Sequence, residues 1–93
     1  MSDRVLITVC FFASLREHTG TSKMEISAGT FVELAEILKA RLSGPGYAAL
    51  MGDNVRIALD QTLAEMSWAE LCASPASLSG LNEIAFLPPV TGG

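Results

Sequence analysis

The last six residues of the sequence, 88–93 ("PPVTGG"), are the part whose residue types could take part in chemistry. The two prolines cannot continue a β-ladder and favour an extended backbone. Val90 and Thr91 are β-branched and favour the same path. Gly92 and Gly93 have no side chain, so they can pass where any Cβ would clash. At ~3.3 Å per residue, this tail would reach about 20 Å from its domain, far enough to enter a narrow channel in another protein.

The α-carboxylate of Gly93 is the only reactive group expected at the tip of this tail. A carboxylate is a poor electrophile, but ATP can convert it to an acyl-adenylate, which a thiol, an amine or a sulfide can attack. The tail contains no nucleophile and no base, so the activating chemistry must belong to a partner. We therefore predict one domain over residues 1–87 and an extended tail over residues 88–93.

The composition restricts the classes of partner. A chain of 93 residues with 49% hydrophobic and 17% charged residues is typical of one globular domain. A net charge of −4 with only six basic residues argues against nucleic-acid binding and suits a basic protein partner.

The cysteine and histidine content indicates a cytoplasmic protein without a metal site. Cys10 and Cys72 form no metal-binding spacing and no CxxC motif, and no signal peptide is recognisable. The single histidine, His18, excludes a multi-histidine metal site and is expected to face solvent. The apolar runs are far shorter than the ~20 residues that span a bilayer, so we expect no membrane contact. We also expect no tightly bound cofactor.

Hydrophobic periodicity predicts four or five strands and one main helix. The helix begins after Thr30, which forms a capping-box spacing with Glu33, and residues 43–46 ("SGPG") end it. Its apolar face is Leu34, Ile37, Leu38 and Leu42. The strands are expected at residues 5–13, 23–27, 55–59, 62–65 and 83–87, with a turn at 60–61 and a short helix after Ser67.

One amphipathic helix needs one sheet face to cover its apolar stripe. The first and last strands are the most apolar, so we place them side by side at the centre of the sheet, where they are parallel. This order predicts an α+β, β-grasp (ubiquitin-like) fold, with a mixed sheet of four or five strands on one main helix. The tail would then leave from a central, well-anchored strand.

Three segments resemble a known family. They are "FFASLRE" at residues 11–17, "ALDQT" at 58–62 and "NEIAFLPPVTGG" at 82–93, and they occur in that family's order. Together they are similar to the small subunits of molybdopterin synthase, which are β-grasp sulfur carriers. The resemblance spans nearly the whole chain.

The resemblance implies a role for each residue of the tail. An activating enzyme of the ubiquitin-activating class would adenylate Gly93 with ATP, and a sulfur donor would convert the adenylate to a thiocarboxylate. The large synthase subunit, whose own active site does the catalysis, would receive the tail, and the sulfur would attack cyclic pyranopterin monophosphate. Two small subunits would flank a dimer of large ones. Gly92, which has no side chain, precedes the sulfur-bearing Gly93. The implied partner-binding residues are Phe86, Leu87, Pro88, Pro89, Val90 and Thr91.

Several alternatives stay open from the sequence. The chain could carry sulfur for thiamine or cysteine synthesis, or it could be a ubiquitin-like modifier that attaches Gly93 to lysines. A stand-alone enzyme has the least support, because no acid/base pair, nucleophile–histidine set or phosphate loop is visible. Trp68, in the 63–80 segment, could anchor a partner or cover the sheet edge. Phe11 and Phe12 point to opposite faces, so one is expected in the core and the other on an exposed docking face or under residues 63–80.

Overall fold

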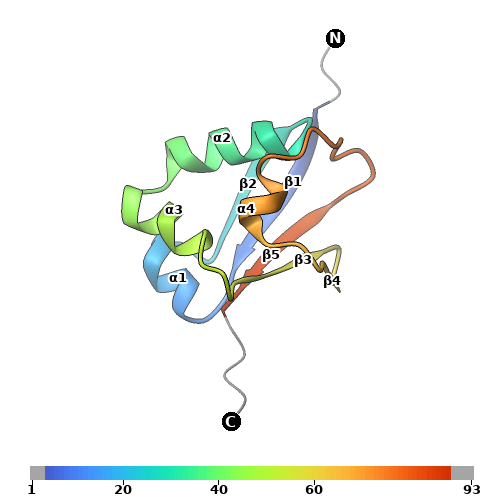
Figure 1. The fold of residues 1–93 in the computed structure, drawn as a ribbon. Coiled ribbons are helices and arrows are strands. Elements are labelled where there is room, and N and C mark those ends of the chain that lie inside the picture. Colours follow the sequence, from blue (N-terminus) through green and yellow to red (C-terminus); the bar gives the residue numbers. More distant parts are fainter. Residues whose placement is uncertain (1–3, 89–93) are drawn as a thin grey trace.

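The structure is a computed structural model, and it describes residues 4–88 (Figure 1). This part of the chain folds into five strands and four helices. In chain order they are β1 (Val5–Phe11), α1 (Ser14–Thr19), β2 (Lys23–Ala28), α2 (Phe31–Arg41), α3 (Gly44–Leu50), β3 (Arg56–Leu59), β4 (Thr62–Leu63), α4 (Trp68–Leu71) and β5 (Glu83–Leu87).

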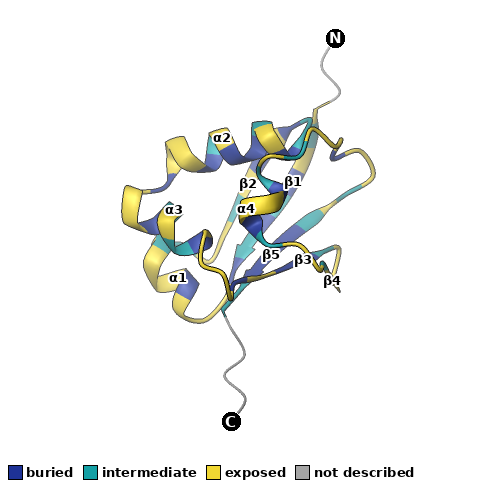
Figure 2. Cartoon of the chain, in the orientation of Figure 1, coloured by how far each residue is buried: buried dark blue, intermediate teal, exposed yellow. Residues whose placement is uncertain are grey.

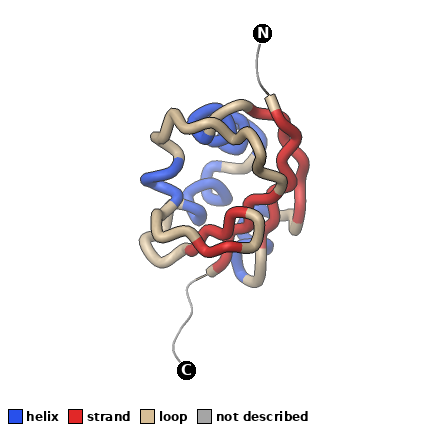
Figure 3. The backbone as a smooth tube through the Cα atoms, turned by 90° about the vertical axis from the view of Figure 1, so that its right-hand side faces the viewer, coloured by secondary structure: helices blue, strands red, loops and turns tan. Residues whose placement is uncertain are grey.

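The five strands form one mixed sheet in the order β2-β1-β5-β3-β4. The central strands β1 and β5 are parallel, and the other neighbours are antiparallel. This confirms the predicted β-grasp arrangement, with the first and last strands side by side. The helices lie on one side of the sheet, and the opposite sheet face is left uncovered (Figures 1 and 3).

The core lies between α2 and the inner face of the sheet. Along β1, Ile7, Val9 and Phe11 are buried while the residues between them are not, as expected for a strand with one covered face. Leu34 and Leu38 of α2 are completely buried against this face. In Figure 2 much of β1 and β5 is therefore dark, and the outer side of α2 is exposed.

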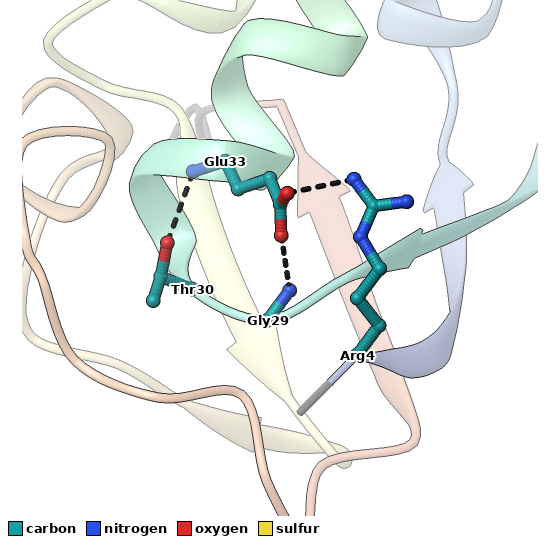
Figure 4. A network of polar contacts seen from close by, with 4 residues as sticks. All are labelled: Arg4, Gly29, Thr30 and Glu33. Carbon is teal, nitrogen blue, oxygen red and sulfur yellow. Dashed lines mark hydrogen bonds and ion pairs between the residues drawn. The ribbon is translucent and has the colours of Figure 1, made fainter. Parts of the chain in front are cut away.

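The first turn of α2 is fixed by polar contacts (Figure 4). The Thr30 hydroxyl accepts a hydrogen bond from the Glu33 amide at 3.1 Å, as the capping-box spacing predicts. The Glu33 carboxylate, however, accepts from the Gly29 amide at 2.6 Å and from Arg4 at 2.7 Å rather than from the Thr30 amide. These two donors, Arg4 first, lower the pKa of Glu33 below its ordinary value. The cap thus ties the start of β1 to the start of α2.

Residues 43–46 do more than end the helix. The Ser43 hydroxyl accepts from the Gly46 amide at 3.0 Å and starts a second helix, α3. α3 packs against α1, and the contact is tight at Gly46. A Cβ on Gly46 would lie 2.9 Å from the His18 carbonyl oxygen, so only glycine fits there.

One edge of the sheet is formed by β2, and two of its outward-facing carbonyls have side-chain partners. The Glu25 carbonyl accepts from the Arg41 guanidinium at 3.2 Å, and the Lys23 carbonyl accepts from the Thr21 hydroxyl at 3.0 Å. α2 therefore supplies a side chain to the edge strand as well as covering the core face.

Candidate functional site

The base of the predicted tail is the end of β5, and its three described residues differ in exposure. Phe86 is completely buried on the inner face, whereas Leu87 and Pro88 are half-buried. Leu87 belongs to the uncovered face of the sheet, opposite Arg56 of β3. The remaining predicted tail residues lie outside the described part of the chain: Pro89, Val90, Thr91, Gly92 and Gly93.

Phe86 is held in a group of three aromatic rings. The Phe11 ring stacks on it with centroids 5.5 Å apart and an interplanar angle of 21°. The Trp68 ring meets it edge-on, with centroids 5.0 Å apart and an angle of 74°. Such arrangements are favourable beyond the area that they bury. The last inward-facing residue before the prolines is therefore fixed on two sides.

Trp68 reaches this position through the short helix α4. Ser67 and Glu70 form a complete capping box at its start, which confirms that predicted spacing. The indole Nε1 donates to the Tyr47 hydroxyl at 3.1 Å, so the buried ring has its donor satisfied. Burial raises the pKa of Tyr47 above its ordinary value, although the hydrogen bond from Trp68 acts in the opposite direction. Trp68 is completely buried, so its interpretation as an exposed partner anchor is wrong, and it packs on Phe86 rather than over the sheet edge.

The uncovered sheet face carries an apolar groove beside the tail base. Its volume is about 460 Å³. The lining residues come from four strands or their ends: Phe12, Ala58, Gln61, Leu63, Glu83, Ala85 and Leu87. Phe12 is 49% exposed and Leu63 is 54% exposed, which is unusual for large apolar side chains that have no partner.

Phe12 reaches the groove because β1 is shorter than the sequence predicts. β1 ends at Phe11, and Ala13 adopts a positive φ of 50° that turns the chain into α1. The Phe12 amide still donates to the Phe86 carbonyl at 3.1 Å, which holds Phe12 next to Leu87 across the sheet. Of the two predicted positions for the second phenylalanine, the uncovered face is therefore the observed one.

The end of the groove away from the tail is polar. The turn at Asp60 and Gln61 has positive φ at both residues, 49° and 72°, and joins β3 to β4 as predicted. One Asp60 carboxylate oxygen accepts from the Asn82 and Glu83 amides at 3.0 and 2.8 Å. This contact fixes the start of β5, and sequence reasoning missed it because the partners are 22 residues apart.

Cys10 lies on the same uncovered face, next to Ala85. Its thiol donates to the Glu83 carboxylate, with a sulfur–oxygen distance of 3.7 Å. Burial, followed by the nearby Glu83 charge, raises the pKa of Cys10. The protonated thiol is the form this site favours, and it is the less nucleophilic one.

Within residues 4–88, no polar or charged residue is buried, and no group of three His, Cys, Asp or Glu side chains is close enough to share a metal ion. His18 is exposed, and its Nδ1 lies 2.7 Å from the Ser14 carbonyl oxygen. None of the helices in this part of the chain is long and apolar enough to cross a membrane. The largely apolar lining of the groove suits the binding of another apolar surface.

The family of the chain follows from its match to known proteins. The model of the ThiS family matches residues 9–93, which include the groove, β5 and the tail. The chain belongs to the ThiS family. It is 35% identical over 89 residues to the molybdopterin synthase sulfur carrier subunit of Escherichia coli K12, covering 95% of this chain and 100% of that protein. This confirms the resemblance inferred from the three sequence segments.

Solved structures of small archaeal modifier proteins have the same fold. The small archaeal modifier protein 1 of Methanosarcina acetivorans matches with a TM-score of 0.69 at 21% identity, covering 99% of this chain and all of that one. The protein of the same name from Haloferax volcanii matches with a TM-score of 0.68 at 19% identity, covering 96% of this chain and 100% of that one. At these identities the likeness establishes the ubiquitin-like β-grasp fold.

Proposed function

We propose that this protein is the sulfur-carrier subunit of a molybdopterin synthase. The observation that carries the proposal is the 35% identity to a sulfur carrier subunit of that enzyme along the full length of that protein. The ending "PPVTGG" supplies the residues that such a carrier needs. The site in the described residues has no catalytic group and offers a binding groove, which suits a subunit that presents its tail to an active site elsewhere.

In the proposed cycle, an activating enzyme of the ubiquitin-activating class binds ATP, and a Gly93 carboxylate oxygen attacks the α-phosphate. Pyrophosphate leaves, and the product is an acyl-adenylate. A sulfur donor then displaces AMP and leaves a thiocarboxylate on Gly93. The large synthase subunit receives the tail, and the thiocarboxylate sulfur attacks cyclic pyranopterin monophosphate. Two such deliveries build the dithiolene of molybdopterin.

The groove is the proposed docking surface for the large subunit, in an assembly of two small and two large subunits. Phe12 and Leu87 lie at the end of the groove nearest the tail, so a partner that takes in the tail also meets these side chains. Phe86 would support docking indirectly, because its buried ring anchors the end of β5, where Leu87 and then Pro88 follow. The proline pair and residues 90–91 would hold the tip away from the domain, and Gly92 would let it pass through a narrow channel.

Removal of Gly93 tests the proposal. The described core ends at Phe86, so we expect the shortened protein to unfold at the same temperature as the full chain. It should form no thiocarboxylate when incubated with ATP, the activating enzyme and a sulfur donor, and no molybdopterin with the large subunit. Molybdopterin formation at the normal rate by the shortened protein would sink the proposal.

Intact-mass spectrometry separates the alternatives. A mass increase equal to replacing one oxygen with sulfur on the free protein supports a carrier. Conjugates to lysine side chains of other proteins would instead indicate a modifier. Thiocarboxylate transfer to thiamine or cysteine precursors, without transfer to the pyranopterin, would assign the carrier to another pathway.

A further inference from the structure

Glu83 is the one acidic residue that lines the apolar groove. It is the first residue of β5 and lies opposite Thr8 of β1, at the end of the groove away from the tail. The Asp60 carboxylate binds the Glu83 amide at 2.8 Å, so the position of this residue is fixed by the backbone. A charge therefore stands at a defined place on an otherwise apolar surface.

The Glu83 carboxylate has no cationic partner in the described part of the chain. The ion pair found within residues 4–88 joins Arg4 to Glu33, far from the groove. The side-chain contact of Glu83 is the neutral Cys10 thiol. Its neighbours on the uncovered face include a second acid, Glu25, in the same cross-strand row. The basic residues of this face are in other rows: Lys23 lies beside Cys10, and Arg56 lies opposite Leu87 at the other end of the groove.

Docking of a partner would remove water from this carboxylate. An ionised group that is buried without a counter-charge is strongly unfavourable, whereas one that meets a cation and its hydrogen bonds is tolerated. The apolar side chains of the groove would accept many surfaces of suitable shape. The carboxylate rejects those that bring an apolar or acidic group to its end of the groove.

We propose that Glu83 determines the specificity of the groove, and that the large subunit seated there places a lysine or arginine side chain over this carboxylate. The inference rests on the proposed function, which supplies the partner. It adds the chemistry of the partner surface: an apolar ridge that fits between Phe12 and Leu63, with a cation at the Glu83 end. A carboxylate that is buried against a cation of the partner affects the affinity as well as the choice of partner, because loss of one charge leaves the other buried and unpaired.

The experiment compares Glu83→Gln with Glu25→Gln in binding to the purified large subunit by calorimetry, at low and at high salt. Glutamine keeps the shape of Glu83 and an acceptor for Cys10 but removes the charge. We expect Glu83→Gln to weaken binding about 10- to 100-fold, since the cation of the partner would lose its counter-charge. Its affinity should also depend less on salt than that of the unmodified protein. Glu25→Gln, on the same face but outside the groove, should change affinity less than about twofold. Glu83→Lys should bind more weakly than Glu83→Gln.

Equal affinity and equal salt dependence for Glu83→Gln and the unmodified protein would overturn the inference. That result, together with weakened binding by a Phe12 variant, would leave the docking face and the proposed function standing. If the unmodified protein does not bind the large subunit at all, the proposed function and the inference both fail. Circular dichroism of each variant confirms that a change in affinity does not come from unfolding.

Discussion

The Trp68 ring meets the Phe86 ring edge-on, with their centroids 5.0 Å apart, directly beneath the strand that carries the tail. The two residues are 18 positions apart in sequence. Both are completely buried. The short helix α4 thus supports the end of β5 from inside the domain.

Removal of the Trp68 side chain should lower the stability of the fold. We expect Trp68→Ala to lower the free energy of unfolding by about 3–5 kcal/mol, because a large ring is removed from a packed core. Urea titration followed by circular dichroism measures the change, since the only tryptophan of the chain is lost. Tyr47→Phe removes only the acceptor for the indole N–H and should cost about 1 kcal/mol. A loss below about 1 kcal/mol for Trp68→Ala would show that the ring is not part of the cooperative core.

Gly46 should be intolerant of any side chain. A Cβ there would lie 2.9 Å from the His18 carbonyl oxygen, which belongs to the backbone and cannot move away cheaply. We expect Gly46→Ala to lower the free energy of unfolding by about 1–3 kcal/mol, measured by urea titration. Gly44→Ala, in the same helix, meets no atom within 4 Å and should stay within about 0.5 kcal/mol of the unmodified protein. Equal effects of the two substitutions would contradict the close approach of α1 and α3.

The Glu33 contacts predict a pH dependence of stability. The Arg4 guanidinium, then the Gly29 amide, lowers the pKa of Glu33 below its ordinary value of 4.5. A carboxyl with a lower pKa in the folded state stabilises the fold fully above its unfolded pKa. That stabilisation disappears as the pH falls through the folded pKa.

The measurement is the midpoint of thermal unfolding at a series of pH values. The difference between the unmodified protein and Glu33→Gln should be constant from neutral pH down to about 5, and it should shrink as the pH falls below about 4.5. Glu36→Gln, on the same helix, changes the net charge equally and controls for that effect. A difference that grows at low pH would contradict the assignment.

The groove predicts that exposed apolar residues matter for binding and not for folding. Phe12→Ala should weaken binding to the large subunit about tenfold or more, as loss of a central aromatic side chain does at interfaces. The melting temperature should change little, because the Phe12 ring is 49% exposed. Leu6→Ala is the matched control, since Leu6 is 62% exposed and lies on β1 outside the groove. Equal losses of affinity for both variants would argue for contact over the whole sheet face instead of the groove.

Much of the fold was predictable because local patterns and global packing agree. The alternation along residues 23–27, the apolar face of α2 and the apolar central strands all depend on which side chains face the core. The parallel pairing of β1 and β5 followed because the two most apolar strands belong at the centre. The end of β1 was not predictable, because the positive φ of Ala13 has no signal in its residue type.

The candidate site was harder to predict than the fold. Its lining comes from residues as distant in sequence as Phe12 and Leu87, and only the sheet register brings them together. The interpretation of Trp68 as an exposed anchor failed because composition does not tell which side of a short helix faces the core. The Asp60 contact with the start of β5 is likewise a tertiary contact between a turn and a loop. The role of the tail residues stays a prediction, because they lie outside residues 4–88.

The edge strand β2 is partly protected against pairing with a strand of another molecule. The unpaired N–H and C=O groups of a free edge strand can pair with a strand of a second molecule, and repeated pairing of this kind leads to aggregation. A second molecule that approached here would first have to displace the Arg41 guanidinium from the Glu25 carbonyl and the Thr21 hydroxyl from the Lys23 carbonyl. Pairing through β2 would therefore compete with contacts already made within the molecule, whereas the apolar groove, which lies towards the β4 edge of the sheet, has no such protection in the described residues.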